Sequence, residues 1–112
     1  MSKKTQYYEK EKVEMNKENK EFYIVRGDRS GVFFGNIAER NSNEVLMNNV
    51  RRLWYWDGAS SISQLSKDGT CKPSNCKFTV TVDEILILDA IEIDKCTDKA
   101  VKSILEVAEW KI

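Results

Sequence analysis

The sequence predicts one α+β domain, with a small, mostly antiparallel sheet of about five strands, one short internal helix and one C-terminal helix. Three observations lead to this fold class. Aromatic and β-branched runs alternate with turns rich in glycine and asparagine, which is typical of antiparallel strands. Residues 61–64 have the form of a helix capping box. Near the C-terminus, apolar side chains recur at helical spacing. A chain of 112 residues allows a single modest core.

The first half of the domain is expected to form a meander of three strands joined by short turns. These strands cover residues 22–25, 32–38 and 44–56. Gly35 lies inside the second strand, so it predicts a bulge or a place where another backbone or a ligand approaches closely. The long third strand is expected to bend at Asn48 and Asn49.

The second half is expected to add a helix, two strands and another helix. Ser61 and Gln64 form the capping box of a short helix over residues 62–67, which Gly69 ends. Residues 77–82 alternate like a half-buried strand, and Asp83-Glu84 is the expected turn into a central strand over 85–93. Thr97 is the expected N-cap of the C-terminal helix. The buried stripe of that helix is predicted to hold Ala100, Val101, Ile104, Leu105 and Ala108.

Residues 1–20 mix charges with poorly spaced apolar residues, which indicates a flexible arm or a frayed helix. An alternative is that Tyr8, Val13 and Met15 dock on a partner subunit. The binding domain is therefore expected to span residues 21–112.

Composition narrows the function. The chain carries 18 basic and 18 acidic side chains, and without net positive charge a duplex nucleic acid is not an expected partner. It has no histidine, so we expect a binding protein rather than an enzyme, with neither metal nor cofactor. Its three cysteines fit free thiols in a reducing compartment. No apolar run could cross a bilayer and the polar N-terminus does not resemble a signal peptide, so we expect a cytoplasmic protein.

The segment 50–56 carries the strongest functional pattern. On a strand, Arg52, Trp54 and Trp56 share one face, while Arg51 lies on the other face with apolar and aromatic neighbours. A guanidinium can bind phosphate oxygens with two parallel hydrogen bonds and a ring can stack on a base, so the segment predicts a site for a small anionic ligand. For the tryptophans taken alone, the core is the favoured place.

Asp89 is the second unusual feature, because it falls in register with the isoleucines of the expected strand 85–93. Burying an unpaired carboxylate there would be costly. It must therefore be turned out by a bulge, pair with an arginine, or accept hydrogen bonds from a ligand. The arginine pair is favoured.

Several stretches resemble small proteins encoded by tailed phages and prophages. They are residues 31–40 (GVFFGNIAER), 50–59 (VRRLWYWDGA), 73–78 (PSNCKF) and 90–93 (AIEI), with the closing Trp110. Within that group the chain resembles the first type of anti-Thoeris antagonists of bacterial defence. The resemblance implies a sponge that binds cyclic ADP-ribose-type signals without cleaving them, with relatives that also hold cyclic oligonucleotides. It also implies a homo-oligomer in the host bacterial cell, with the ligand at a subunit interface.

No residue motif accompanies this resemblance, so the expected ligand contacts come from the residues themselves. Arginines would meet the phosphates, rings would stack, and polar side chains would contact ribose or base. The candidates are Arg51, Arg52, Trp54, Trp56, Phe34, Phe78, Asn36, Asn75 and Asp89. Two alternatives stay open. One is a phage structural or host-protein-binding factor that uses the Trp-Tyr-Trp strand as an interface, and the other is a histidine-free hydrolase that uses Asp83 and Glu84 with a divalent ion.

Overall fold

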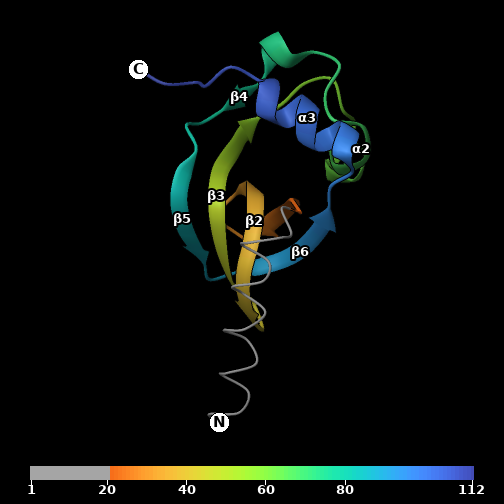
Figure 1. Cartoon of the computed structure of the whole chain (residues 1–112). Coiled ribbons are helices and arrows are strands. Elements are labelled where there is room, and N and C mark those ends of the chain that lie inside the picture. The colour runs from red at the N-terminus through yellow and green to blue at the C-terminus, as the bar shows by residue number, and fades with distance from the viewer. Residues whose placement is uncertain (1–20) are drawn as a thin grey trace.

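The computed structural model describes residues 21–112, so the expectation for residues 1–20 lies outside the described residues. Six strands, two helices and one 3-10 turn follow each other in these residues (Figure 1). Their bounds are β1 Tyr23–Gly27, β2 Val32–Asn41, β3 Glu44–Tyr55, α2 Ile62–Asp68, η1 Pro73–Asn75, β4 Lys77–Phe78, β5 Val82–Ile87, β6 Ala90–Lys95 and α3 Asp98–Glu106. The predicted α+β class, with an antiparallel sheet, an internal helix and a C-terminal helix, is confirmed.

The long strand β3 organises the sheet. The strand order is β4-β3-β2-β1-β6, and β5 pairs with β3 alongside its first half, whereas β4 pairs with its second half. Strands β5 and β6 stand at opposite ends of this order, yet only Leu88 and Asp89 separate them in the chain. The sheet therefore curls back on itself, and Figure 1 shows β5 and β6 approaching each other at its lower end.

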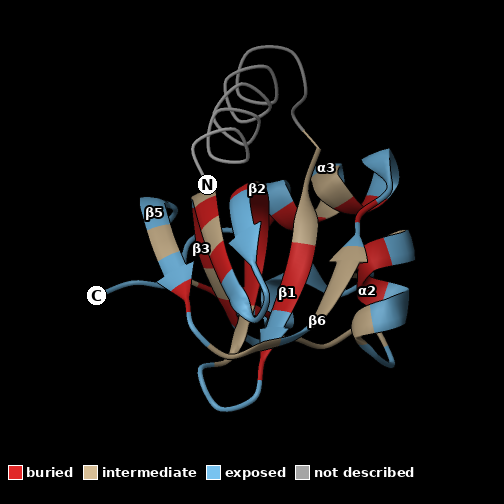
Figure 2. Ribbon diagram, turned by 90° about the horizontal axis from the view of Figure 1, so that it is seen from below, coloured by how far each residue is buried: buried red, intermediate tan, exposed pale blue. Residues whose placement is uncertain are grey.

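The curled sheet has a core on each face. The helix-side core lies between the sheet and the two helices, and it contains Ile24, Phe34, Leu53, Leu65, Cys76, Phe78, Cys96, Ala100, Ile104 and Val107. The inner core fills the concave face, and it contains Val25, Phe33, Val45, Met47, Val50 and Ile87. Because side chains alternate along a strand, each central strand supplies both cores. Figure 2 shows the buried residues along these strands.

Gly35 sits at the predicted bulge between β2 and β3. A Cβ atom on Gly35 would lie 2.8 Å from the carbonyl oxygen of Asn48 and 2.9 Å from that of Asn49, so only glycine fits. Asn49 has a positive φ of 51°, which inserts an extra residue into β3. As a result, Met47 and Val50 both reach the inner core although they are three positions apart. The predicted bulge is confirmed, and it falls at Asn49, one of the two residues where the bend was expected.

Both helices begin where the sequence predicts. The Ser61 side chain accepts the N–H of Gln64 at 3.2 Å, and the Gln64 side chain accepts the N–H of Ser60 at 2.8 Å. Gly69 ends α2 with a positive φ of 77° and donates its N–H to the last turn. The Thr97 hydroxyl accepts an N–H of the first turn of α3 at 3.1 Å. These are local hydrogen bonds, so neighbouring residues suffice to predict them.

The region after η1 differs from the expected pair of strands. The expected strand 77–82 is interrupted, because residues 79–81 face only two residues of β3 between the pairs Leu53–Phe78 and Val50–Val82. The expected single strand 85–93 is also wrong, since the chain turns at Leu88 and Asp89 and starts β6. The expected turn at residues 83–84 instead lies inside β5.

The end of α3 departs from the expected stripe. Ala100 and Ile104 are buried, but Leu105 is half exposed and Ala108 is exposed. The helix ends at Glu106, and the next residue, Val107, turns into extended backbone and is buried instead. The stripe therefore continues from Ile104 to Val107, three positions on, and does not reach Ala108. Neither helix of residues 21–112 is long and apolar enough to cross a membrane.

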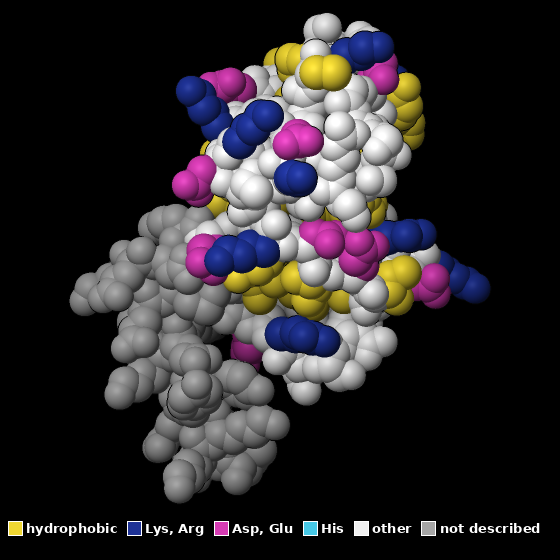
Figure 3. All heavy atoms as spheres, turned by 90° about the vertical axis from the view of Figure 1, so that its right-hand side faces the viewer, with side chains coloured by type: hydrophobic (Ala, Val, Ile, Leu, Met, Phe, Trp, Pro, Cys, Tyr) yellow, Lys and Arg dark blue, Asp and Glu magenta, His cyan; other side chains and the backbone are white. Residues whose placement is uncertain are grey.

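Apolar surface is not confined to one place. Large apolar side chains that are at least one-third exposed include Val80, Val82, Leu86, Leu88, Ile91 and Leu105. On the side that carries β6, Figure 3 shows a band of hydrophobic side chains bordered by acidic and basic ones. Exposed apolar groups by themselves therefore do not locate a functional site here. A site needs polar groups that converge beside them.

Candidate arginine-tryptophan site

Arg52 is the centre of the candidate site. It lies on β3 opposite Phe33 of β2, and its guanidinium carbon is 4.5 Å from the centre of the Phe33 ring. Its Nη1 donates to the carbonyl oxygen of Ser30, in the turn between β1 and β2. Gly31 in that turn has a φ of 118°, and a Cβ atom there would lie 2.9 Å from Nη1 of Arg52. The turn and the ring thus fix the guanidinium while leaving it partly exposed.

Two hollows flank this guanidinium. The tryptophan-side hollow measures about 510 Å³ and is lined by Ser30, Gly31, Val32, Arg52, Leu53, Trp54 and Trp56. The β5-side hollow measures about 430 Å³ and is lined by Arg29, Ser30, Phe33, Arg52, Ile85, Leu86, Ile87, Leu88 and Asp89. The two sets share only Ser30 and Arg52. The arginine therefore stands between an aromatic and an aliphatic hollow.

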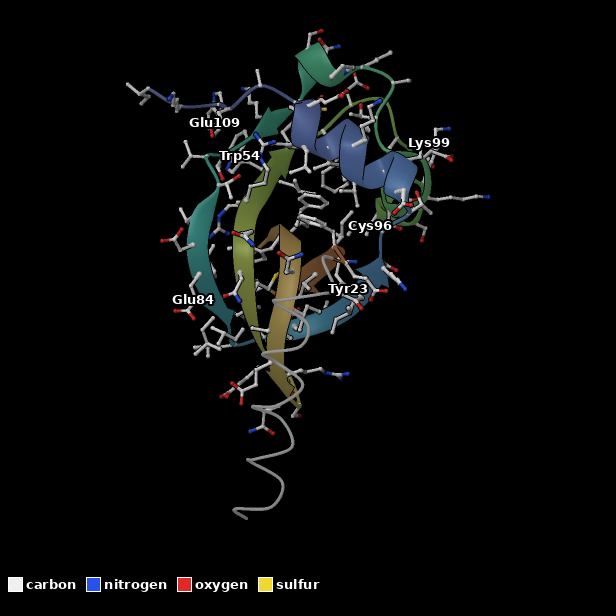
Figure 4. All side chains as sticks on the ribbon, viewed as in Figure 1. Tyr23, Trp54, Glu84, Cys96, Lys99 and Glu109 are labelled. Atoms are coloured by element: carbon white, nitrogen blue, oxygen red, sulfur yellow. The ribbon has the colours of Figure 1, made fainter. Side chains whose placement is uncertain are left out.

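Trp54 supplies an exposed ring that is supported by a stack with Trp110. It is 58% exposed, so the expectation that the tryptophans belong to the core is wrong for this residue. Its ring stacks on Trp110 with centroids 5.0 Å apart, and the Lys77 ammonium lies 5.4 Å and 5.5 Å from the two rings. The N–H of Trp110 donates to the carbonyl of Phe78 at 2.8 Å, which ties the C-terminal tail to β4. Figure 4 shows Trp54 beside the tail residue Glu109.

Trp56 differs from Trp54. It is partly buried and packs against the helix-side core, yet it lines the tryptophan-side hollow. The stacked rings and the charge of Arg52 suit a planar, anionic ligand, because arginine binds phosphate and indole faces bind bases.

Asp89 accepts hydrogen bonds from the turn between β1 and β2 and does not pair with an arginine side chain. Its Oδ2 accepts the main-chain N–H groups of Arg29 at 2.8 Å and of Ser30 at 3.1 Å, and its Oδ1 accepts the Ser30 hydroxyl. The hydroxyl of Ser30, followed by the N–H of Arg29, holds the pKa of Asp89 below its usual value. The favoured arginine pair is therefore wrong. Asp89 does not occupy the expected strand position, because it lies in the turn between β5 and β6, and this turn places it beside these donors.

Arg51 is internal, which corrects its expected role at the phosphates. It is 3% exposed and donates to the carbonyl oxygens of Thr79 at 2.9 Å, Phe78 at 3.1 Å, Ile104 at 2.9 Å and Val107 at 3.1 Å. Burial lowers the pKa of its guanidinium, and the nearby carboxylate of Glu109 opposes that shift. Its donors are used within the fold, so it holds α3 and β4 to β3.

Four further candidates do not reach either hollow. Phe34 and Phe78 are fully buried in the helix-side core. Asn36 is buried and donates to the carbonyl of Glu21 at 2.7 Å, while its side-chain oxygen accepts from Asn49 at 2.8 Å. Asn75 is exposed, but its amide donates to Asp57 at 3.1 Å across a separate loop. The structure thus assembles Arg52, Trp54, Trp56 and Asp89 and separates the other five candidates from them.

Arg29, Ser30, Lys77 and Trp110 are among the residues of this surface that the sequence interpretation missed. Arg29 and Ser30 belong to a turn that was assigned only a linking role. Trp110 and Lys77 come from distant parts of the chain. The available signal was the run of polar residues between two glycines at 27–31, which is longer than a tight turn needs.

None of the three cysteines lines either hollow of this surface. Cys71, Cys76 and Cys96 are free thiols, and burial raises the pKa of Cys96 to about 12. Among residues 21–112, no group of three or more cysteine, aspartate or glutamate side chains lies close enough to hold a metal ion. The two hollows are lined by charged side chains, aromatic rings and aliphatic side chains.

These features define an α+β domain with an open arginine-tryptophan surface at one end of its central strand. A family model described as Domain of unknown function (DUF6948) matches residues 20–104. That match covers most of the chain, so the chain belongs to this family. No curated protein and no solved structure matches it.

Proposed function

We propose that the protein is a binding protein for a small nucleotide, which it holds at the arginine-tryptophan surface without cleaving it. The observation that carries the proposal is the partly exposed Arg52 guanidinium, fixed by Ser30 and Phe33, beside the exposed ring of Trp54. A guanidinium fixed in advance loses less conformational entropy when phosphate binds. A supported indole offers a face on which a base can stack.

Within this class we propose a phage anti-defence sponge that acts in the cytoplasm of the host. It would sequester cyclic ADP-ribose-type signals, and the same site would admit cyclic oligonucleotides. The support for this narrower proposal is the resemblance of residues 31–40 and 50–59 to phage anti-Thoeris proteins. A homo-oligomer would close the open hollows over the ligand, which tight sequestration requires.

The test is recovery of the ligand. The purified protein is incubated with cyclic ADP-ribose, separated from free ligand, heated, and the released compound identified by mass spectrometry. Intact ligand is the expected result. Degraded ligand would identify an enzyme, and absence of uptake would reject the cyclic ADP-ribose proposal. Trp54→Ala should reduce uptake at least about tenfold, whereas Leu105→Ala, at a half-exposed site on α3, should leave it unchanged.

A second candidate function is a protein interface. Trp54, Tyr55 and Trp110 are 58%, 50% and 44% exposed at the same end of β3, and aromatic residues are enriched at interfaces. This candidate predicts no rise in melting temperature with any nucleotide and a protein partner lost in Trp54→Ala. A nucleotide-dependent rise that Trp54→Ala abolishes would decide for the first function.

A further inference from the structure

We infer that the free edge of β5 binds an extended segment of another protein, which adds to the sheet as an antiparallel strand. The segment carries apolar residues opposite Leu86 and Ile85, followed by two basic residues opposite Glu84 and Asp83. Binding at this edge goes beyond the proposed nucleotide binding and does not depend on it. Three features of β5 lead to this partner: its open edge, the protection of the other edges, and its charge.

The first feature is the open edge of β5. The strand pairs with β3 through five residue pairs, and no other strand of residues 21–112 pairs with it. In an antiparallel ladder, the main-chain N–H and C=O groups of alternate residues point away from the partner strand. Along its outer edge β5 therefore presents main-chain donors and acceptors with which an extended segment can pair.

The β5-side hollow runs along this edge. Ile85, Leu86 and Ile87 are consecutive on β5, and all three line that hollow. Because consecutive side chains of a strand point to opposite faces, one hollow reaches all three only along the backbone edge between the faces. The tryptophan-side hollow is lined by no residue of β5. A strand added to β5 therefore leaves the surface around Trp54 open.

The second feature is that the other two edges of the sheet are protected. At β4, a parallel bridge between Phe78 and Glu109 covers the edge with the C-terminal tail. On β6, Lys95 pairs with Glu21 at 2.8 Å, and Glu92 also carries a charge. Charged side chains on an edge strand prevent pairing with other chains. These two edges therefore have the devices by which proteins keep foreign strands away.

Strand β5 lacks these devices. Between Val80 and Leu88 the chain has no lysine, arginine or proline, and residues 84–87 pair with β3 in regular register. The outward side chains are apolar and accessible, since Val82 is 38% exposed and Leu86 is 53% exposed. A regular apolar edge of this kind invites another strand. The edge therefore has the properties of a binding surface.

The third feature is the negative charge at one end of β5. Asp83 and Glu84 are exposed, and neither forms an ion pair within the described part of the chain. Opposite charges directly across a strand pair stabilise it, so basic residues are favoured at these two positions. Neither carboxylate lines the hollow that contains Arg29 and Arg52. The basic residues therefore pair outside that hollow.

The outer face of the sheet beside β5 adds to this negative charge. Leu46 of β3 lies opposite Leu86 of β5. A hollow of about 290 Å³ surrounds this pair, and it is lined by Glu39, Asn41, Glu44, Leu46 and Leu86. That lining contains two carboxylates and no basic side chain. A basic segment is therefore attracted to this part of the sheet.

The experiment measures binding of a fluorescein-labelled peptide, Thr-Val-Leu-Val-Arg-Lys-Thr, to the full chain by fluorescence anisotropy at fixed ionic strength. In antiparallel register its apolar residues lie opposite residues 85–87 and its basic pair lies opposite Glu84 and Asp83. The same peptide with Glu-Glu in place of Arg-Lys should bind at least about tenfold more weakly.

Two further peptides, N-methylated at alternate residues, test the mode of binding. One set of methyl groups replaces the N–H groups that face β5, and the other set replaces those that face away. Only one of the two peptides should therefore lose affinity, by at least about tenfold. Equal affinity of the two methylated peptides would show attraction by charge alone and would overturn strand addition.

The variant Leu86→Lys places a charge on the β5 edge, as β6 already has. It should weaken peptide binding at least about tenfold, because the new ammonium disrupts the apolar contact and repels the basic pair. Ile91→Lys on β6 is the matched control, since Ile91 is 55% exposed and Leu86 is 53% exposed. It should keep the parent affinity, and unchanged melting temperatures would establish that both variants fold.

Several outcomes would overturn the inference. Equal weakening by Leu86→Lys and Ile91→Lys would remove β5 as the binding edge, and absence of peptide binding would remove the partner class. If the peptide does not bind while Leu86→Lys lowers the molecular mass measured by light scattering, a second copy of the chain covers the edge instead. Each of these results would leave nucleotide binding at Trp54 to be decided by its own test.

Discussion

Arg51 and Arg52 follow each other on β3 and meet opposite environments. Arg51 faces the helices, is 3% exposed, and donates to four main-chain carbonyls from β4, α3 and their flanks. Arg52 faces the concave side, stacks on Phe33 and donates to one carbonyl. Alternation along the strand separates them, and what covers each face decides whether an arginine supports the fold or remains available to a ligand.

The two faces of β3 are covered by different parts of the chain. On the helix side, Ile104 of α3 and Val107 after it pack with Leu53 of β3 in the helix-side core. On the concave side, the inner core ends at Val50 on β3, so Arg52 and Trp54 lie beyond it. The two faces of one strand are therefore a closed structural face and an open face, and the following experiments test that division.

The largest expected effect concerns thiol reactivity on the closed face. Burial, followed by the charge of Asp94, raises the pKa of Cys96 to about 12, so at pH 8 its thiolate should be roughly a thousandfold rarer than that of a free cysteine. A colorimetric disulfide reagent should titrate the exposed Cys71 rapidly in the native protein and all three thiols in guanidinium. Rapid reaction of Cys96 in the native protein would show that the helices do not seal this face.

The raised pKa of Cys96 also makes the stability of the fold depend on pH. Because the folded pKa of Cys96 is raised, folding favours the thiol form. This contribution is complete below the unfolded pKa of about 8.5 and is lost as the pH rises toward 12. Cys96→Ala should reduce the loss of stability in that window, measured by urea unfolding at several pH values.

Next in size is the effect of Arg51→Met. Removing the guanidinium leaves four buried carbonyls without these donors, so the free energy of unfolding should fall by about 3 kcal/mol or more. Urea denaturation followed by circular dichroism measures this loss. Arg51→Lys should also destabilise the fold, because an ammonium cannot reproduce the fork of donors.

Arg52→Met should cost about 1 kcal/mol or less, because the stack on Phe33 is partly exposed and one hydrogen bond is lost. The same variant should weaken nucleotide binding at least about tenfold. Together with Arg51→Met it forms a matched pair that separates stability from binding. Equal destabilisation by the two substitutions would contradict the division between a closed and an open face.

The smallest effect concerns Asp89, which shapes the open face from the β5–β6 turn. Its folded pKa is lowered by the Ser30 hydroxyl and the Arg29 N–H, so its contribution to stability is present above the unfolded pKa of about 3.9 and is lost as the pH falls through the lower folded value. Asp89→Asn should therefore lower the melting temperature slightly at pH 7 and converge with the parent protein in acid. Asp83→Asn, on the exposed surface of β5, serves as the control.

The candidate site was only partly predictable. The sequence pattern placed Arg52, Trp54 and Trp56 on one face of a strand, and the structure keeps them at one hollow. It could not indicate that Arg51 would be used by α3, because the carbonyls of Ile104 and Val107 lie 53 and 56 positions away in the chain. Asp89 was assigned to a strand because its isoleucine neighbours continue the alternation, whereas its donors lie about sixty positions earlier.

What the sequence determined by itself is local. The caps at Ser61 and Thr97, the bulge at Gly35 and the alternation of β3 follow from residues within a few positions of each other, since these hydrogen bonds and backbone conformations are short-range. The tertiary structure alone decided which face of β3 is covered and that Trp110 supports Trp54. Those outcomes depend on how the sheet curls and where α3 docks, and they rest on contacts between distant segments that no local pattern encodes.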